Sequence, residues 1–349
     1  MTEANESVPV GSKRDFSIYG VVVVAVGIFL WFILGNFPQT MAGTIFIATV
    51  IGTLMFWRFR LVIAFAGISA LLATQTLDIE HMISFMNIDV ITFLVAMMIL
   101  VYIAKESGFF TWLLGYLLRL TRYDPTKVMI MLLIMSTLMA ALVDEVTSIL
   151  FITAIVFEYC QFFEIDPVPY VISTVMATNV GSSATMLGNP IGILIGLRGG
   201  LTFEDFLRWA SPVAILSLFA IIGICIFWYR KPLREAKAKV TQKMNSSQGG
   251  EVFEKIPPKK MREVKLSGIL LFATVFLVAI HYRMELLLGV EKFIYLLVAA
   301  FMGAAIGLLW KRNKAQMIVE RGVDWWTLLF FMFLFAKAGA LHYTGLTDK

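Results

Sequence analysis

The chain has 349 residues, of which 59% are hydrophobic and 15% are charged, and its mean hydropathy is +0.83. Soluble domains are about 45–50% apolar and about 25% charged. The composition therefore excludes a soluble globular enzyme, a disordered protein and a nucleic-acid binder, although the formal net charge is +5. The two cysteines and three histidines are too few and too dispersed for a disulfide framework or a metal cluster. We predict an all-α polytopic membrane protein whose main contact is the lipid bilayer.

Apolar runs recur along the whole chain, and about 20 mostly apolar residues cross a bilayer core. The runs lie at about 18–34, 43–57, 61–74, 88–104, 126–143, 147–160, 168–200 (interrupted), 212–229, 266–282, 293–310 and 324–341. The polar N-terminus carries no signal-peptide cleavage pattern, so the first run is predicted to be a retained span. Residues 109–123 alternate aromatic and leucine residues with two arginines, which is typical of a helix along the membrane interface.

Lysine and arginine are distributed unevenly between the loops, and basic loops stay cytoplasmic. With the N-terminus inside, 23 of the 29 basic residues fall in cytoplasmic segments. We therefore predict a multi-pass plasma-membrane protein with a cytoplasmic N-terminus. The segment 230–265 holds 11 basic and 4 acidic residues and is predicted to be a solvated cytoplasmic linker. It separates an N-terminal membrane repeat (1–229) from a second membrane segment (266–349).

Two similar segments, 88–94 and 323–329, are offset by 235 residues, and each opens a long apolar helix. The predicted topology runs these helices in opposite directions, which indicates an inverted repeat of the kind common in secondary transporters. The same offset places counterparts of the polar features around 144 and 179 beyond Lys349. We therefore expect the second repeat to be truncated.

The first polar insertion lies in the apolar segment 126–160 and contains Asp144, Glu145 and Thr147. One interpretation is a tight external loop between two spanning helices. The other is a re-entrant hairpin whose tip lies at mid-membrane depth. The tip has no Gly, Pro or Asn, so it is a poor water-exposed turn, and carboxylates inside a membrane usually mark an ion path. These arguments favour the hairpin.

The second polar insertion interrupts the apolar segment 168–200. Its candidate binding residues are Asn179, Gly181, Ser182, Ser183, Thr185, Gly188, Asn189 and Pro190. Gly and Pro weaken a continuous helix, and unwound backbone at membrane depth survives only where it is buried or lines a cavity. Freed carbonyls can hold a cation there, and half-helix N-termini can face an anion. Close packing of small residues is the alternative, but it does not explain two asparagines and a proline.

Chemistry of other kinds finds little support in the sequence. No Gly-rich stretch is followed by the Lys-Ser/Thr of a phosphate loop, and no nucleophile–base pair or metal-ligand spacing is present, so we predict neither an ATP-driven pump nor an enzyme. Lys337 lies about 20 Å along its helix from Asp324 at the usual helical rise. A lysine at the outer end of the helix is the expected interpretation, and a functional lysine is the alternative.

Several stretches together resemble one transporter family. They are 88–110, 143–148, 166–169, 177–196 and 323–331. Over about 85–345 the chain resembles the arsenite permease, sodium/proton antiporter and P-protein branch of the ion-transporter superfamily, which carries a citrate transporter-like domain. This resemblance implies a re-entrant hairpin, a broken helix and their inverted repetition. It also implies that Asp144, Glu145 and Thr147 form the hairpin tip and that 179–190 forms the broken-helix loop.

The family commonly has Asn where this chain has Glu145, and two adjacent acids repel one another when buried. This departure favours coupling to protons or sodium. We predict a secondary active transporter in which Asp144 and Glu145 bind the coupling Na⁺ or H⁺. Asp144 and Asn179 are the candidate ligands of a transported sodium ion, and no resident metal or cofactor is expected.

The sequence leaves the substrate open among sodium exchanged for protons, a di- or tricarboxylate, and arsenite. A non-transporting membrane scaffold or an inactive truncated remnant is the alternative to a transporter. Family members often dimerise, so the resemblance also implies a homodimer.

Overall fold

The computed structural model describes residues 12–143, 145–245 and 258–347, and these residues form helices and loops without strands. The helices are α1 (Lys13–Leu34), α2 (Phe37–Met55), η1 (Trp57–Phe59), α3 (Arg60–Ala73), α4 (Ile79–Phe85), α5 (Ile88–Glu106), α6 (Phe109–Leu120), α7 (Pro125–Leu142), α8 (Glu145–Phe163), α9 (Val168–Ser182), α10 (Pro190–Gly199), α11 (Phe203–Trp228), α12 (Arg230–Asn245), α13 (Pro258–Ala279), α14 (His281–Leu288), α15 (Ile294–Trp310), η2 (Arg312–Lys314), α16 (Ala315–Gly322) and α17 (Trp325–Tyr343). The predicted all-α membrane class is confirmed.

Within the described ranges, seven helices are long and apolar enough to cross a membrane, or up to nine if two bent helix pairs each count as a span. The pair α13–α14 bends by 56°, and α15 bends by 94° from the segment that contains η2 and α16. Two predicted runs are shorter than a full span. The run at 61–74 forms the 14-residue α3, and the run at 168–200 divides into α9 and α10.

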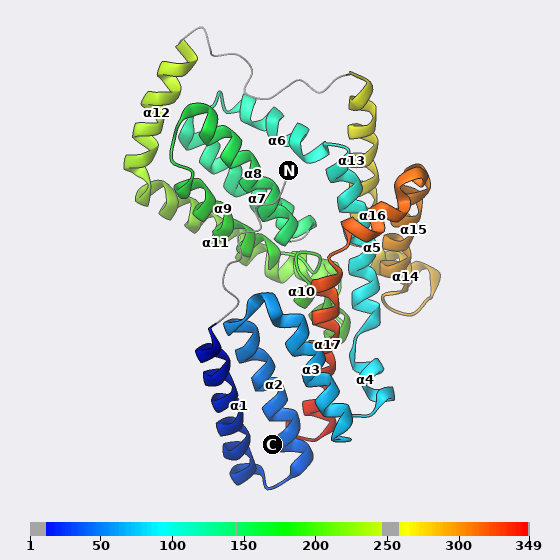
Figure 1. Ribbon diagram of the computed structural model, residues 1–349. Helices are drawn as coiled ribbons and strands as arrows, with labels where there is room; N and C mark the ends of the chain where they lie inside the picture. The colour runs from blue at the N-terminus through cyan, green and yellow to red at the C-terminus, as the bar shows by residue number, and fades with distance from the viewer. Residues whose placement is uncertain (1–11, 144, 246–257, 348–349) are drawn as a thin grey trace. The chain divides into compact units, whose positions relative to one another are not determined.

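The chain divides into two compact units. Unit 1 comprises residues 1–91 and 324–349. In its described part, α2 packs between α1 and α3, and α17 packs against α2, α3 and α4 (Figure 1). Gly339 brings α17 very close to α4, because a Cβ atom there would lie 2.2 Å from Cγ of Phe85. The last helix along the chain is therefore part of the same bundle as the first three.

Unit 2 comprises residues 92–323, so α5 begins in unit 1 and continues in unit 2. Helix α7 packs along α8 and α9, and α11 packs against α9 and α7 (Figure 1). Helix α13 packs against α15 and α6. The two predicted polar insertions, between α7 and α8 and between α9 and α10, both belong to this unit.

Helix α12 occupies the first part of the segment that the sequence analysis assigned to a solvated linker. Its side chains Leu233, Ala236 and Val240 are buried, and their spacing puts them on one face of the helix. Its basic side chains form ion pairs with one acidic residue at the start of α7 and one at the end of α8. Lys237 Nζ lies 3.2 Å from Asp124, and Lys243 Nζ lies 2.8 Å from Glu164. This part of the linker is thus a docked amphipathic helix, and 246–257 lies outside the described residues.

Two stretches of the chain share one succession of helices. In each, a long helix is followed by a short helix and then by a 19-residue helix, as α3–α4–α5 and as α15–α16–α17. A glycine with positive φ follows two residues later, Gly108 at 83° and Gly345 at 71°. The ends of the two 19-residue helices, Glu106 and Tyr343, are offset by 237 residues along the chain. This offset is two residues larger than the 235-residue offset of the sequence motif.

Lys337 is buried in unit 1, which its expected position at the outer end of the helix does not imply. The side chain is 0% exposed, and Nζ donates a hydrogen bond to Oγ1 of Thr49 at 2.8 Å. Helix α17 continues for six residues after Lys337, up to Tyr343, so Lys337 does not lie in the last turn of the helix. Its environment is set by α2 and α3, which the position along α17 does not reveal.

Candidate functional site

The first polar insertion is the sharp junction between α7 and α8. Helix α7 ends at Leu142 with Val143 as its C-cap, and α8 begins at Glu145. Val143 is buried and Glu145 is half-buried. Asp144, which the sequence predicts as a ligand of the coupling ion, lies outside the described residues. The backbone N–H of Glu145 donates to the carbonyl oxygen of Gly188 at 3.1 Å, so the junction is attached to the second polar insertion.

The second polar insertion is a true interruption of the helix, as predicted. Helix α9 ends at Ser182 and α10 begins at Pro190. Asn189 is the N-cap of α10, and its Oδ1 accepts from the N–H of Gly192 at 2.7 Å. Its Nδ2 donates to the carbonyl of Ser182 at 3.0 Å. One asparagine therefore starts α10 and also ties it to the end of α9.

Glycine is required at two positions of the broken helix, because backbone atoms occupy the space of a side chain. A Cβ atom at Gly181 would lie 2.2 Å from the carbonyl oxygen of Thr137 on α7. A Cβ atom at Gly188 would lie 2.3 Å from the carbonyl oxygen of Ser182. The first contact lets α9 lie directly against α7, and the second closes the loop on the end of α9. Both glycines serve close approach, without the positive φ that usually selects glycine.

Thr185 forms a second connection between the insertions. Its hydroxyl donates to the carbonyl of Ala141 near the end of α7 and accepts from the backbone N–H of Leu187 at 3.1 Å. Thr185 and Ala141 are buried, and Ala141 packs with Ala184 and with Ala214 of α11. The loop between α9 and α10 is therefore enclosed by protein, which is what unwound backbone requires inside a membrane.

The structure gathers some of the predicted residues and leaves others apart. Glu145, Thr185 and Gly188 form the contact between the α7–α8 junction and the second insertion. The second insertion itself contains Gly181, Ser182, Asn189 and Pro190, at the end of α9 and the start of α10. Thr147 is half-buried in the first turn of α8. The side chains of Asn179 and Ser183 are exposed. The hydroxyl of Ser183 bonds to the carbonyl of Val180 at 2.8 Å, so it serves its own helix end.

Two buried hydroxyls that the sequence analysis did not select lie on the two hairpin arms, Thr137 on α7 and Ser148 on α8. Thr137 donates from Oγ1 to the carbonyl of Ala177 on α9 at 3.1 Å. Ser148 is 0% exposed, and its Oγ has no hydrogen-bond partner among the described residues. Ser148 lies three residues after Glu145, which puts both on one face of α8. That spacing is the signal from which it could have been found.

The electrostatics of the contact combine two helix N-termini with a carboxylate. The hydrogen bond from Glu145 to Gly188 joins the first residue of α8 to the loop just before α10. The N-terminus of each of these helices carries a partial positive charge. Glu145 supplies negative charge in the first turn of α8. In the described ranges, no three His, Cys, Asp or Glu side chains gather as a metal centre. Carboxylate, hydroxyl and carbonyl oxygens are groups that suit Na⁺ or a proton.

The far ends of the hairpin arms are both held by α12. Asp124 is the N-cap of α7, where its carboxylate accepts from the N–H groups of Thr126 and Lys127. Partial burial acts to raise the pKa of Asp124, but these bonds and Lys237 outweigh it and hold the pKa below its usual value. At the end of α8, the bond from Lys243 lowers the pKa of Glu164. Both carboxylates are therefore held in the charged form beside a basic helix.

Both hairpin arms reach the length of a span. Helix α7 has 18 residues and α8 has 19, and both are apolar enough to cross a membrane. At the usual helical rise, 18 residues extend about 27 Å, which is comparable with the ~30 Å hydrocarbon core. The arm length thus agrees with an external loop and with a re-entrant tip, and the distinction depends on what surrounds the tip.

Comparison with known proteins gives the family. A family model described as Citrate transporter matches residues 45–349. An uncharacterized transporter of Mycobacterium tuberculosis (strain CDC 1551 / Oshkosh) is 28% identical over 263 residues, which are 75% of this chain and 57% of that protein. The 46 kDa membrane protein of Mycobacterium leprae (strain TN) is 25% identical over 264 residues, with the same two shares, 75% and 57%.

A further relative is the P protein of Homo sapiens, which is 25% identical over 177 residues, or 47% of this chain and 20% of that protein. The chain thus spans 57% of the length of the mycobacterial relatives. The family match covers most of the chain and confirms the resemblance that the sequence motifs indicate. The chain belongs to the citrate transporter family and is a multi-pass membrane protein.

Proposed function

We propose that the protein is a secondary active transporter, driven by a sodium or proton gradient, and that the coupling ion binds where the α7–α8 tip meets the broken helix. Glu145 and Asp144 provide the carboxylates of this site. The broken-helix segment 179–190, from the end of α9 to the start of α10, completes it with backbone oxygens and with the N-terminus of α10. Thr147 and the buried hydroxyl of Ser148 lie on the α8 side.

The observation that carries the proposal is the hydrogen bond from Glu145 N to Gly188 O at 3.1 Å. It joins two interrupted helices at their polar breaks, and binding sites of secondary transporters typically lie between discontinuous helices. This bond fixes the backbone of Glu145 at the junction, and the carboxylate extends from there. A cation that binds there neutralises a carboxylate whose hydration is otherwise reduced by the surrounding protein.

Burial around the tip supports the re-entrant arrangement over an external loop. Val143 and Ser148, on either side of the tip, are 6% and 0% exposed, and Thr185 covers the tip from the broken helix. A tip in open water would not need such cover. The shared helix succession ending at Gly108 and Gly345 supports an inverted repeat of this unit. The basic α12 beside both arm ends supports placing those ends in the cytoplasm of a plasma-membrane protein.

The chemical groups of the proposed site suggest an order in which to test the candidate substrates. Its oxygen ligands suit Na⁺, which favours sodium exchanged for protons as the first transport reaction to test. The family description adds citrate, and the chemistry of a helix N-terminus allows an anion such as a di- or tricarboxylate or arsenite. Neither polar insertion contains Arg or Lys, so an anion would bind through backbone N–H groups and a bound cation.

The test uses the full chain reconstituted in vesicles that contain a pH-sensitive dye. Sodium is added outside acid-loaded vesicles, and the lumenal pH is recorded. Sodium-dependent alkalinisation is expected in the wild type and is expected to be lost in Glu145→Gln. The matched control is Glu158→Gln, because Glu158 lies on the same helix with an exposed side chain. This variant should retain the wild-type response.

Uptake of labelled citrate and arsenite is measured in the same vesicles with and without a sodium or proton gradient. Gradient-dependent uptake that Glu145→Gln abolishes would identify the anion as substrate with Glu145 in the coupling path. If Glu145→Gln and the control Glu158→Gln lose the same share of transport, Glu145 does not have the proposed role in ion coupling. Wild-type vesicles that match empty vesicles in every assay would overturn the transport proposal.

A further inference from the structure

Lys337 is a buried amine that the proposed site in unit 2 does not use. Its side chain is 0% exposed, and Nζ donates to Oγ1 of Thr49 at 2.8 Å. The Thr49 hydroxyl in turn donates to the carbonyl of Ile45 at 2.8 Å. The space for the amine is made by Gly67 of α3, where a Cβ atom would lie 3.0 Å from Nζ. The lysine head is therefore accommodated by its neighbours on α2 and α3.

The charged groups on the helices packed against α17 are engaged elsewhere. Helix α2 has no charged residue. On α3 the charged residue is Arg60, in the first turn, where it donates to Oγ1 of Thr327 at 2.7 Å. Helix α4 carries Glu80 and His81, and His81 bonds to Asp78 at 2.7 Å.

On α17 itself, Asp324 caps the first turn and His342 lies in the last turn. In the described part of unit 1, no carboxylate forms an ion pair with Lys337. An ammonium buried without a counter-ion is costly, because the protein interior replaces its hydration poorly. An ionisable side chain inside a membrane bundle is accordingly a functional candidate.

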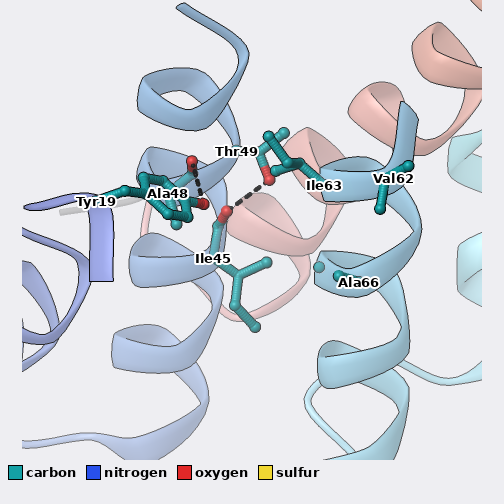
Figure 2. A pocket seen from close by; sticks show the side chains of 8 residues that line it. Tyr19, Ile45, Ala48, Thr49, Val62, Ile63 and Ala66 are labelled. Atoms are coloured by element: carbon teal, nitrogen blue, oxygen red, sulfur yellow. Dashed lines mark hydrogen bonds between the residues drawn. The ribbon is translucent and has the colours of Figure 1, made fainter. Parts of the chain in front are cut away.

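A pocket of about 210 Å³ lies between α1, α2 and α3, and Figure 2 shows its lining. Its lining comes from α1, α2 and α3: Tyr19, Ile45, Ala48, Thr49, Val62, Ile63, Ala66 and Gly67. Thr49 and Gly67 contact Lys337 and also line the pocket, so they separate the amine from it.

The pocket is unsuited to an anion. Its two hydroxyls already donate to carbonyls, Tyr19 to Ala48 at 2.9 Å and Thr49 to Ile45 at 2.8 Å, as the dashed lines in Figure 2 show. The other lining residues are glycine or have apolar side chains. A small anion would find no free hydroxyl hydrogen there, whereas a proton needs neither a cavity nor donors.

We propose that Lys337 is a reversible proton-binding site inside the contact of α17 with α2 and α3. In this step a hydronium ion transfers its proton to the lone pair of Nζ, so that the amine becomes an ammonium and a water molecule is left. Release returns the proton to water. The Thr49 oxygen accepts a hydrogen bond from either form. Proton binding here does not depend on the proposed transport function, so its test omits transport.

The test is a ¹³C NMR titration of the full chain labelled at the lysine ε-carbon, purified in detergent micelles. The ε-carbon shift distinguishes the amine from the ammonium. The signal that disappears in Lys337→Gln is assigned to Lys337, and Lys337→Met provides the assignment if that variant does not fold. Lys265→Gln, at an exposed lysine on α13, is the matched control.

The Lys337 signal is expected to convert between the two forms between about pH 5 and about pH 10, where exposed lysines remain ammonium. Thr49→Val should lower its midpoint by about one pH unit, because the ammonium donates a stronger hydrogen bond to the Thr49 oxygen than the amine does. A signal that keeps one form throughout this range would overturn the proposal. So would an ammonium that forms only when formate or chloride is added, which would identify an anion site.

Discussion

The backbone N–H of Glu145 and the carbonyl of Gly188 form a hydrogen bond of 3.1 Å that joins the start of α8 to the loop before α10. The two segments are also joined by Thr185, whose hydroxyl bonds to the carbonyl of Ala141. Because these contacts involve backbone atoms, they fix the relative position of the two helix breaks rather than of single side chains. We therefore expect this junction to contribute strongly to the stability of unit 2.

Replacement of Gly181 by alanine should disrupt the packing of α9 on α7. The new Cβ atom would lie 2.2 Å from the carbonyl oxygen of Thr137, a backbone atom that cannot move without shifting α7. Overpacking of this kind typically costs about 1–3 kcal/mol and at times more, so we expect a lower unfolding temperature and a lower yield of folded protein. Thermal unfolding in detergent, followed by circular dichroism, measures the change.

The matched control is Gly223→Ala in α11, where a Cβ atom would meet nothing within 4 Å. Alanine favours a helix over glycine by about 1 kcal/mol, so this variant should be neutral or slightly stabilised. Equal unfolding temperatures for Gly181→Ala and the wild type would contradict the packing seen between α7 and α9.

Substitution of Thr185 by valine should weaken the same junction without changing its shape. Valine removes the donor to Ala141 and the acceptor for the N–H of Leu187, both of which are buried. Leaving buried backbone groups unpaired costs about 1–3 kcal/mol. Thr153→Val is the control, because the Thr153 hydroxyl bonds only within α8, to Ile149 at 2.7 Å and Leu150 at 3.3 Å. Similar losses of unfolding temperature in the two variants would argue against a special role for Thr185.

The sequence was sufficient to predict the helices and the position of the polar breaks. Long apolar runs identify spans through composition alone, and Gly and Pro identify the interruption between α9 and α10. The capping role of Asn189 was not predicted. The partners of these residues could not be predicted. The contact of Gly181 with Thr137 depends on how closely α7 and α9 approach, which small residues permit but do not specify.

Lys337 and α12 show that hydropathy alone does not predict which side chains are buried. The expected position of Lys337 was the outer end of its helix. The side chain is buried because α2 and α3 pack against α17. The segment that contains α12 was expected in water because charges dominate it, and it docks because Leu233, Ala236 and Val240 align on one face. In both cases hydropathy gave the average polarity, whereas the direction of individual side chains decided the environment.

Asn189 should contribute to stability in two separable ways. Its Oδ1 caps α10, and its Nδ2 bonds to the carbonyl of Ser182 at 3.0 Å. Loss of an N-cap side chain costs about 0.5–2 kcal/mol, so Asn189→Ala should lower stability by that amount plus the loss of the second bond. Asn189→Ser keeps a capping oxygen but loses the Nδ2 group that donates to Ser182, and it should lie between alanine and the wild type in unfolding temperature.

Asn36→Ala provides the comparison, because Asn36 caps α2 by accepting from the N–H of Gln39 at 3.3 Å and serves no second helix. Its loss should be the smaller of the two alanine effects. If serine at position 189 is no better than alanine, capping is not the source of the stabilisation.

The attachment of α12 to the hairpin should weaken in acid. The pKa of Asp124 is held below its usual value because backbone N–H bonds and Lys237 outweigh the effect of burial. A carboxylate whose folded-state pKa is depressed stabilises the fold above its unfolded pKa of about 3.9, and this contribution disappears as the pH falls through the folded value. Asp124→Asn keeps the capping oxygen and removes the charge.

The unfolding temperatures of the wild type and Asp124→Asn should therefore differ at neutral pH and converge below about pH 4. Because Lys237 is 64% exposed, its share of the difference should be about 0.2–1 kcal/mol. Lys237→Gln removes the ion pair from the other side and should reduce the Asp124→Asn effect in the double variant. A gap between wild type and Asp124→Asn that stays constant from neutral pH into acid would show that the Asp124 charge does not hold α12 in place.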